Sequence, residues 1–382
     1  MKIIKEWLGS ILHIILLILI ILAAEFYFLQ QYTGSASNFL RFFKVLQIVE
    51  DRYNGELDKD KLFEGAMKGM VQAVGDPYTV YLDKKSFKNL SEITHGSFVG
   101  VGIVYGKRVN KYVVISALDD GPSAKAGVKA GDVILAVDGE PTSTMDMEEV
   151  SQKIRGKIDT EVVLELKYKD EEPRKGRIIR KTIKSPSIVS KMLDDTEIGY
   201  IRISNFNENT GDDFRRAYQE LEGKGMKATL LDLRANPGGT LTDGVAVAGM
   251  LVPKGPIVSV VDKKGKTYTE NSKLEKVKYP LAVLVDGGTA SAAEIVSGAV
   301  KDTGSGKLFG VKTFGKGSVQ SVIPLGREAA VKVTTAKYLT PSGVSIHNKG
   351  IEPDVVVELP EKATKDVQLD AAKEYLEAEL RK

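Results

Sequence analysis

The chain has no cysteine and very little histidine, and these two shortages exclude several kinds of chemistry. Its 382 residues include 0 cysteines and 3 histidines. Without thiols the chain can form no disulfide, no cysteine nucleophile and no thiolate zinc site, although the redox compartment stays undecided. His13 lies in an apolar segment, His95 before a glycine-rich loop and His347 in a turn-like run. None of the three stands in a context typical of the base that activates a serine.

An excess of charge is also missing. The chain carries 54 basic and 51 acidic residues, a formal net charge of +3. A balance of this kind creates no large field to attract nucleic acid, so we expect no nucleic-acid partner. A hydrophobic content of 42% with 27% charged residues is typical of a globular protein. At roughly 100 to 200 residues per domain, two or three domains are expected.

One apolar run stands near the amino terminus. Trp7–Leu29 is almost entirely apolar, is unbroken over Ile14–Ala24, and follows Lys2 and Lys5. About 20 apolar residues cross a bilayer, and lysines before the run favour a cytoplasmic amino end. We therefore expect a retained membrane anchor. The alternatives are a cleaved signal sequence with a small-residue site at Ser35-Ala36, or a buried core helix. Whether the run is a retained anchor or a cleaved signal sequence, the rest of the chain would lie outside the cytoplasm.

Helical spacing of apolar residues follows over Asn38–Leu90 and predicts two or three helices. This segment either caps the next domain or carries the face of a homodimer. From Gly96 onward, short β-like runs are separated by glycines. These runs are 97–105, 112–117, 133–137 and 161–168.

Within this β-rich part, Gly121–Glu140 closely resembles the PDZ signature: Gly127 and Gly131 turn the chain and Asp138-Gly139 is a hairpin turn signal. A PDZ groove binds an extended peptide as an added strand and holds its terminal carboxylate in a nest of backbone N–H groups. We expect this nest to be formed by Val99-Gly100-Val101-Gly102-Ile103. The alternative is that these residues form an ordinary hairpin loop. Met147, Val150 and Ile154 fit either a second helix that closes the groove or a plain core face.

Beyond Pro186 apolar runs alternate with helical patterns, which indicates a βαβ domain. The expected strands are 198–203, 228–233, 281–285, 319–324, 330–337 and 351–359, and the expected helices are 209–222, 242–251, 292–300 and 365–382.

Two motifs in this part carry candidate chemistry. Asn236-Pro237-Gly238-Gly239 ends a strand with a turn whose backbone amides could bind an oxyanion, although such a turn alone is a weak signal. In Thr289-Ala290-Ser291-Ala292-Ala293-Glu294, Ser291 is either a nucleophile or an ordinary helix cap. Lys316, between two glycines, is either a surface residue or a buried base, and Gln320 could orient its amine. Asp243 and Glu294 would hold the lysine charged if they paired with it, so we do not count them as catalytic.

Together these motifs resemble the carboxy-terminal processing proteases over nearly the whole chain after residue 37. Lys316 follows Ser291 by 25 residues, and Phe314–Gln320, Thr340-Pro341-Ser342-Gly343 and Gly350–Asp354 also look like that family. The usual proline-glycine-threonine turn after the second PDZ helix is replaced by Ile158-Asp159-Thr160.

The resemblance implies a multidomain α/β fold with a ClpP/crotonase-like peptidase core. It implies Ser291 as nucleophile, Lys316 as general base, Gln320 as its orienting partner, and an oxyanion hole from the backbone of Gly238 or Gly239 and of Ala292. The implied parts are a membrane anchor or signal sequence at 1–36, a helical amino-terminal region at 37–94, a PDZ domain at 95–185, the peptidase core at 186–360 and a carboxy-terminal helix at 361–382.

The resemblance also implies protein substrates with apolar carboxy termini, located outside the cytoplasm, and no cofactor or metal. Arg155 is a candidate for coupling the PDZ domain to the core, and its alternative is a solvated surface arginine. Two other classes compete with the peptidase. One is a catalytically silent, membrane-tethered PDZ adaptor, which would have no need of Ser291, Lys316 and Gln320 together. The other is a crotonase-type acyl enzyme, against which the PDZ signature argues.

Overall fold

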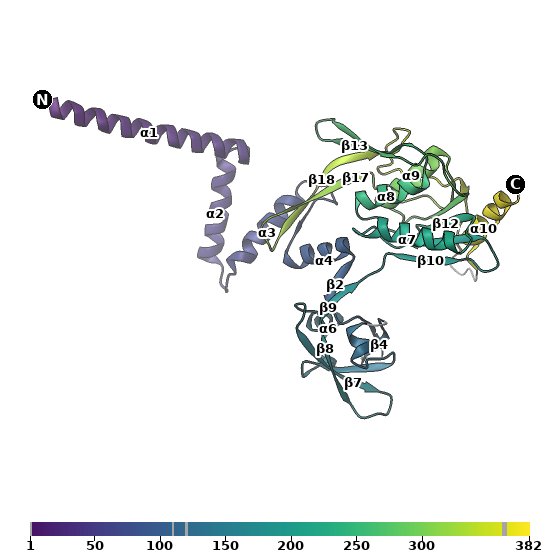
Figure 1. Cartoon of the computed structure of the whole chain (residues 1–382). Coiled ribbons are helices and arrows are strands. Elements are labelled where there is room, and N and C mark those ends of the chain that lie inside the picture. Colours follow the sequence, from purple (N-terminus) through teal and green to yellow (C-terminus); the bar gives the residue numbers. More distant parts are fainter. Residues whose placement is uncertain (1, 109–110, 119–120, 361–364) are drawn as a thin grey trace. The chain divides into compact units, whose positions relative to one another are not determined.

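The computed structural model describes residues 2–108, 111–118, 121–360 and 365–382 (Figure 1). Contacts between residues divide the chain into two compact units, Met1–Gly69 and Met70–Lys382. Residues 361–364, where the expected carboxy-terminal helical segment begins, lie outside the described residues.

The first unit consists of helices. They are α1 (Lys2–Thr33), α2 (Ala36–Arg52) and most of α3 (Lys59–Gln72), and the side chain of Ser35 caps α2 by accepting the N–H of Asn38. Across the described ranges, no helix combines the length and the apolarity that crossing a membrane requires. The membrane helix expected at Trp7–Leu29 is therefore not supported.

The second unit contains a small antiparallel sheet where the PDZ signature predicted one. Its strand order is β3-β4-β5-β7-β8, with β6 on the side of β5. The strands are β3 (Ile103–Arg108), β4 (Lys111–Ala117), β5 (Asp132–Val137), β6 (Glu140–Pro141), β7 (Glu161–Tyr168) and β8 (Arg174–Ile179). Short helices α5 (Pro122–Lys125), η1 (Thr142–Thr144) and α6 (Met147–Ile154) complete it. Val150 and Ile154 of α6 are buried in the core of this sheet, whereas Met147 is exposed.

The expected strand 97–105 is in fact two strands. β2 (Ser97–Gly100) pairs with β9 (Lys181–Lys184), and the chain then turns at Gly102, whose φ is +73°, before β3 begins. A positive φ of this kind is open to glycine at little cost and interrupts the ladder.

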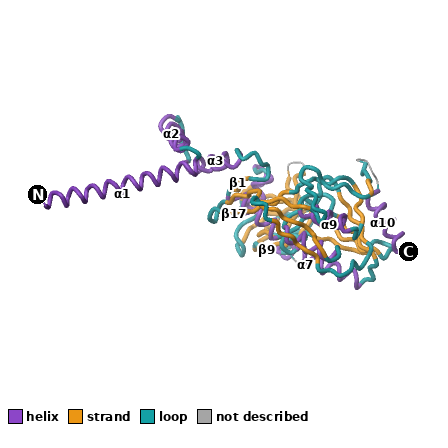
Figure 2. The backbone as a smooth tube through the Cα atoms, turned by 90° about the horizontal axis from the view of Figure 1, so that it is seen from above, coloured by secondary structure: helices purple, strands orange, loops and turns teal. Residues whose placement is uncertain are grey.

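A six-stranded sheet forms the largest part of the second unit. Its order is β10-β11-β12-β15-β16-β19, antiparallel between β10 and β11 and parallel elsewhere. The strands are β10 (Ile188–Met192), β11 (Ile198–Ile203), β12 (Ala228–Asp232), β15 (Leu281–Val285), β16 (Lys307–Gly310) and β19 (Val355–Val356). Figure 2 shows helices α7, α9 and α10 of the second unit beside its strands.

Both faces of this sheet are covered, which explains why its strands are continuous apolar runs in the sequence. One face packs on α7 (Thr210–Gly223), α8 (Leu241–Leu251) and α9 (Ala292–Thr303), and the other on α10 (Val367–Leu380). Successive residues alternate between the two cores: Leu231 belongs to the first and Leu230 to the second.

The expected last strand, 351–359, is reduced to the two residues of β19. Pro353 has no N–H to donate, and the Asp354 side chain accepts the N–H of Leu308 at 2.8 Å. The backbone N–H groups of Asp354 and Val357 donate to the carbonyls of Leu308 and Gly310 at 2.9 and 2.8 Å, so the pairing with β16 is confined to the short stretch 354–357.

A second sheet of the core has the order β1-β18-β13-β14, with β17 also paired to β18. Its strands are β1 (Val80–Leu82), β13 (Gly255–Asp262), β14 (Thr267–Ser272), β17 (Ser318–Pro324) and β18 (Ala330–Leu339). β1 is followed by α4 (Lys84–His95), which leads into β2. Residues before the PDZ-like sheet in sequence therefore form part of the same sheet as the strand that follows Lys316.

Candidate active site

Three loops that carry the candidate motifs meet at one edge of the six-stranded sheet. They follow the parallel neighbours β12, β15 and β16 and contain Gly238, Ser291 and Lys316, respectively. Loops after the carboxyl ends of adjacent parallel strands open on the same edge, where α/β proteins place their binding sites. The topology therefore brings together residues that are far apart in sequence.

The loop after β12 packs directly against Ser291. Gly238 has φ +91°, and a Cβ there would lie 2.7 Å from the Cβ of Ser291 and 2.8 Å from the backbone N of Ala292. Only glycine allows this approach. The Gly238 N–H already donates to Asn236 Oδ1 at 2.8 Å. Of the two alternatives for the first oxyanion donor, Gly238 or Gly239, the geometry therefore favours the N–H of Gly239.

Ser291 has a strained backbone. It stands at the N-cap of α9 with φ +55° and ψ −117°, a region that residues with a Cβ rarely adopt. Its carbonyl accepts a hydrogen bond from the hydroxyl of Tyr338 at 3.2 Å. Burial raises the pKa of Tyr338 well above its ordinary value, and the nearby Glu294 carboxylate raises it further, so the phenol stays protonated and able to donate. Strain at a single serine between a buried strand and a buried helix is typical of a functional residue.

Glu294 joins the loop of Ser291 to the loop of Lys316. Its fully buried carboxylate accepts the Ser291 N–H at 3.0 Å and the Lys316 N–H at 2.8 Å through Oε2. Through Oε1 it accepts the Thr313 hydroxyl at 2.6 Å and the Gly315 N–H at 2.7 Å. Four hydrogen bonds to one buried carboxylate fix the two backbones relative to each other.

This role of Glu294 was missed from the sequence, where the residue was judged only as a partner of the lysine amine. Its place three residues after Ser291, at N3 of the helix, was a signal for a carboxylate that bonds backbone N–H groups. Nothing in the spacing indicated Gly315 and Lys316 as two of the donors.

Lys316 is half-buried, and burial lowers the pKa of its amine below the ordinary value. The charge of Lys332 lowers this pKa further, whereas the Glu294 carboxylate raises it. The amine lies 5.0 Å from the centre of the Tyr78 ring. Within the described part of the chain, no hydrogen bond joins it to the hydroxyl of Ser291. Catalytic contacts are often open in an enzyme without substrate and close when substrate binds.

Gln320 lies on β17 and does not contact the lysine amine as expected. Its Nε2 donates to Ser318 Oγ at 2.9 Å and to Thr334 Oγ1 at 3.2 Å, and no hydrogen bond to Lys316 occurs among the described residues. The carboxylate of Asp243 accepts the Gly211 N–H and the Thr240 hydroxyl, and no hydrogen bond joins it to Lys316 among the described residues. That Asp243 has no catalytic part stays a prediction.

A buried ion pair supports the loop after β12 and was also not foreseen. Arg234 donates to both carboxylate oxygens of Asp366 at 2.8 Å and to both oxygens of the fully buried Asp232. Tyr200 donates to the same Asp232 at 2.8 Å. The start of the Asn236–Gly239 loop is thereby tied to the residue that caps α10.

The expected peptide groove of the PDZ-like sheet lies between β3 and α6. Val101 is buried and its carbonyl accepts the N–H and the hydroxyl of Ser123. The hydroxyl of Tyr105 on β3 shares a hydrogen bond of 2.7 Å with Ser151 Oγ on α6. The strand after the expected loop and the helix expected to close the groove are therefore neighbours, and the carboxylate nest at Val99–Ile103 stays a prediction.

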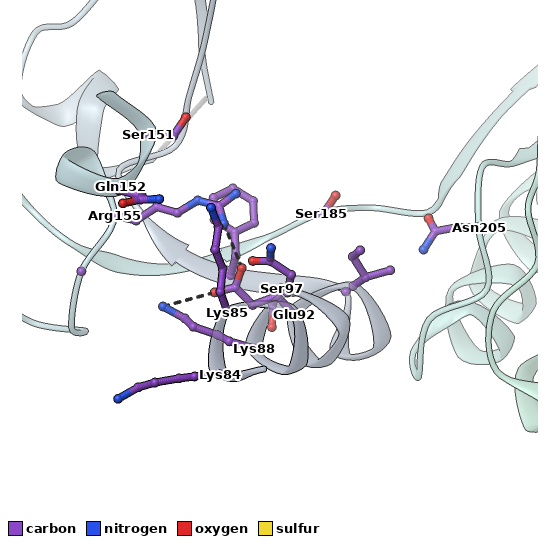
Figure 3. Close-up of a pocket in the computed structure, with 15 residues that line it drawn as sticks. Lys84, Lys85, Lys88, Glu92, Ser97, Ser151, Gln152, Arg155, Ser185 and Asn205 are labelled. Atoms are coloured by element: carbon purple, nitrogen blue, oxygen red, sulfur yellow. Dashed lines mark hydrogen bonds and ion pairs between the residues drawn. The ribbon is translucent and has the colours of Figure 1, made fainter. Parts of the chain in front are cut away.

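Arg155, at the end of α6, contacts α4 and not only solvent. Its guanidinium donates to Glu92 at 3.2 Å and lies 5.3 Å from the centre of the Phe98 ring. It therefore links the PDZ-like sheet to a helix that precedes it (Figure 3). Its role in coupling the PDZ domain to the core stays a prediction.

Comparison with protein families agrees with this architecture. The model of peptidase family S41 matches residues 197–357, a PDZ domain model matches residues 113–167, and the activating protease CtpB N-terminal domain model matches residues 27–86. Fold and site thus define an S41 serine-type peptidase that carries a PDZ domain.

The relatives narrow this class. The chain is 38% identical to carboxy-terminal processing protease CtpA of Bacillus subtilis, covering 89% of this chain and 73% of that one. It is 35% identical to CtpB of the same organism, covering 83% and 67%. The solved photosystem II D1 C-terminal processing protease is 30% identical, with a TM-score of 0.50 and coverage of 92% and 95%. The chain belongs to the carboxy-terminal processing protease family.

Proposed function

We propose that this chain is an endopeptidase that captures the exposed apolar carboxy-terminal tails of proteins outside the cytoplasm and hydrolyses their peptide bonds through Ser291 and Lys316. The observation that carries the proposal is the single buried carboxylate of Glu294, which holds the backbones of both residues. A strained serine beside a glycine loop and a lysine of lowered pKa supply the remaining parts of an acyl-transfer site.

In the acylation step the neutral Lys316 amine takes the proton of the Ser291 hydroxyl while the oxygen attacks the substrate carbonyl carbon. The carbonyl π electrons move to the oxygen, and the N–H groups of Gly239 and Ala292 stabilise this oxyanion. As the oxyanion collapses, the C–N bond breaks and the Lys316 ammonium gives its proton to the departing amine. The acid part of the substrate is then an ester on Ser291.

Deacylation repeats these roles with water. Lys316 takes a proton from the water that attacks the ester carbonyl, and the same two N–H groups stabilise the second oxyanion. When the C–O bond breaks, the proton returns from Lys316 to Ser291 Oγ. The new carboxy terminus leaves and the enzyme is restored.

For this chemistry the Lys316 amine must be neutral and close to Ser291. Its lowered pKa meets the first requirement in part. The second requires the amine to reach the hydroxyl of Ser291. In the structure the amine lies 5.0 Å from the centre of the Tyr78 ring, whose face favours the charged ammonium. We propose that Gln320 then accepts a hydrogen bond from the amine and orients it.

The PDZ-like sheet would supply the substrate by adding the tail as a strand along β3. We propose an apolar tail because the residues beside this position, Val101, Ile103 of β3 and Ile154 of α6, form one apolar cluster. The names of the relatives, which describe processing at carboxy termini, support the same class of substrate.

The location outside the cytoplasm rests on Lys2 and Lys5 before the apolar run Trp7–Leu29. It predicts that protease added to intact cells degrades a tag placed at the carboxy terminus of the full chain. Degradation only after the cells are lysed would show that this proposal is wrong.

The function is tested by cleavage of an unfolded protein with an apolar tail by the full chain and three variants: Ser291→Ala, Lys316→Ala and Lys312→Ala. Lys312 is an exposed lysine four residues earlier that pairs with Glu352 at 2.7 Å, so it controls for loss of a charge. We expect the parent and the control to cleave and the first two variants to be inactive. No cleavage by any of the four proteins would favour the silent PDZ adaptor, and equal cleavage by all four would show that neither Ser291 nor Lys316 is needed for the reaction.

Coupling of the PDZ domain to the core by Arg155 is a further part of the proposal. If the 3.2 Å contact with Glu92 transmits it, Arg155→Ala and Glu92→Gln should change the cleavage rate alike, and the double variant should add nothing. Unchanged cleavage and peptide affinity in Arg155→Ala would remove this role.

A further inference from the structure

The turn Asp76–Thr79 lies beside the candidate catalytic residues, although it precedes the PDZ-like sheet in sequence. It leads into β1, which pairs with β18, the strand that also pairs with the strand of Gln320. The amine of Lys316 lies 5.0 Å from the centre of the ring of Tyr78, which belongs to this turn. The amino-terminal segment and the peptidase core therefore meet at the candidate active site.

The carboxylate of Asp76 organises this turn. Its Oδ1 accepts the Tyr78 N–H at 3.1 Å, and its Oδ2 accepts the hydroxyl of Thr79 at 2.6 Å. The pKa of the Asp76 carboxyl is lowered, first by a hydrogen bond from the side chain of Thr334 and next by the bond from Thr79. The group is therefore ionised at neutral pH, and an ionised carboxylate only accepts hydrogen bonds. Both threonine hydroxyls donate their protons to it.

The direction of these bonds decides what the two threonine oxygens can do next. Because the Thr79 proton is used on Asp76, the Thr79 oxygen is free to accept, and it takes the N–H of Thr334 at 3.1 Å. The Thr334 proton is used on Asp76 as well, so the Thr334 oxygen also accepts. Gln320 lies directly opposite Thr334 in the β17–β18 ladder, and its Nε2 donates to that oxygen at 3.2 Å. Hydrogen bonds therefore run in one direction, from Gln320 through Thr334 to Asp76.

This chain of bonds fixes which end of the Gln320 amide faces the hydroxyls. Both protons of Nε2 are used, one on Thr334 and the other on Ser318 Oγ at 2.9 Å. In the part of the chain that the structure describes, Oε1 of Gln320 accepts no hydrogen bond. An amide turned by half a rotation would place Oε1 against the Thr334 oxygen, two acceptors opposed. The amide oxygen is thereby kept available for the amine of Lys316.

We infer that Asp76 is a positioning residue of the peptidase, which holds the Gln320 amide with its oxygen free for the amine of Lys316. The inference rests on the proposed function and adds to it a residue of the amino-terminal region. Asp76 contacts no reacting atom in this arrangement, so it acts only through Gln320. Without Asp76 the proton of Thr334 is released and can turn toward Gln320, and the amide is then free to rotate.

The test measures kcat and KM on an unfolded protein with an apolar tail, with tail affinity and urea unfolding on the same samples. Asp76→Ala removes the acceptor of the chain of bonds. Thr334→Val removes the hydroxyl that links Asp76 to Gln320, and Thr334→Ser keeps that hydroxyl. Gln320→Met and the double variant Asp76→Ala/Gln320→Met complete a double-mutant cycle.

The matched control is Asp302→Ala. The carboxylate of Asp302 also accepts one backbone N–H and one hydroxyl, both from Ser342, at 2.9 and 2.6 Å. Asp302 stands near the carboxyl end of α9, whereas Ser291 caps the opposite end of that helix. This variant therefore loses the same kinds of hydrogen bond away from the candidate active site.

We expect Asp76→Ala and Thr334→Val to lower kcat about 10- to 100-fold, which is the range for one hydrogen bond to a charged group, with KM and tail affinity unchanged. Thr334→Ser and Asp302→Ala should keep the parental kcat. In the Gln320→Met background, Asp76→Ala should cause no further loss. A parental kcat in Asp76→Ala, or an equal loss with and without Gln320, overturns the inference. If urea unfolding shows that Asp76→Ala does not fold, the comparison of Thr334→Val with Thr334→Ser decides in the same way.

The two proposals fail in different ways. A parent that cleaves, with Asp76→Ala equal to it, contradicts only the part assigned to Asp76. A parent that cleaves nothing contradicts the proposed function, and the Gln320 side chain then decides the inference by itself. Its NH₂ protons are followed by NMR on the full chain labelled with nitrogen-15 in its glutamine side chains, with Gln320→Met to assign them. Exchange with water about tenfold faster in Asp76→Ala than in the parent supports the inference, and equal exchange overturns it.

Discussion

Replacing Glu294 by glutamine should misplace both candidate catalytic residues without removing either. The glutamine can turn its carbonyl oxygen toward the N–H groups of Ser291 and Lys316 and keep both bonds. Its NH₂ group then faces the N–H of Gly315, two donors opposed, and also the hydroxyl of Thr313, which already accepts the N–H of Ile351 at 2.7 Å. The opposite orientation would strand two backbone donors and is worse.

Hydrogen bonds to charged groups contribute about 1.5–3 kcal/mol each, and a buried donor left unpaired costs about 1–3 kcal/mol. Glu294→Gln should therefore destabilise the core by about 2–4 kcal/mol, which leaves it folded if its stability is in the ordinary range. A shift of the order of 1 Å between Ser291 and Lys316 should lower kcat by about 100-fold, with little change in affinity for a tail peptide.

The assay is kcat and KM on an unfolded protein with an apolar tail, with urea unfolding and peptide affinity on the same samples. The matched control is Glu197→Gln, an exposed glutamate 3.7 Å from Lys227, which should change stability by less than about 0.5 kcal/mol. If Glu294→Gln cleaved at the parental rate, Glu294 would not be the residue that positions Ser291 and Lys316.

Three other changes test neighbouring parts of the site. Gly238→Ala places a Cβ 2.6 Å from the Ala290 carbonyl oxygen at a φ of +91°, so kcat/KM should fall about 100- to 1,000-fold while tail affinity is kept; parental activity would refute the close packing. Lys316→Met should be inactive yet unfold at a higher temperature than the parent at pH 7. Between the lowered pKa of Lys316 in the folded chain and 10.5, the unfolded chain binds more protons than the folded one, so the stability of the parent rises with pH. The difference in unfolding temperature between Lys316→Met and the parent should therefore narrow as the pH rises. A variant less stable than the parent at pH 7 would contradict this. Arg234→Ala leaves the buried Asp232 short of donors and should cost about 3–5 kcal/mol in urea unfolding, against a negligible effect expected if the pair were solvent-exposed.

Much of the core could be predicted from the sequence because its strands are buried on both faces. The apolar runs expected at 228–233 and 281–285 are the strands Ala228–Asp232 and Leu281–Val285. Their parallel pairing brings the loops of Gly238 and Ser291 together, which the alternation of strands and helices already indicated. The roles of these residues stay predictions until activity is measured.

Contacts between distant segments could not be predicted in the same way. Glu294 bonds Lys316, 22 residues away, and Arg234 bonds Asp366, 132 residues away. The spacing of apolar residues indicates which face of a helix or strand is buried. It does not indicate which backbone N–H groups donate hydrogen bonds to a buried carboxylate. The arrangement of Lys316 over Tyr78 is of the same kind, because the two residues lie in segments on either side of the PDZ-like sheet in sequence.

Two expectations failed for local reasons. The run 97–105 is divided by a turn at Gly102. The alternation of apolar and polar residues does not indicate that the chain pairs with β9 before this turn and with β4 after it. The run 351–359 shows β-like apolar residues, yet it pairs with β16 only over a short stretch around Val355-Val356, after Pro353, which has no N–H to donate. At Gly102 turn chemistry prevails over β propensity.

The central claim is that the neutral amine of Lys316 activates Ser291, and the pH dependence of kcat/KM between pH 6 and 10 tests it most directly. The account predicts activity that rises with pH through a single apparent pKa below 10.5, the ordinary value for lysine, and no activity at any pH in Lys316→Ala. A profile that does not change with pH, or a Lys316→Ala variant that keeps the profile of the parent, would contradict it.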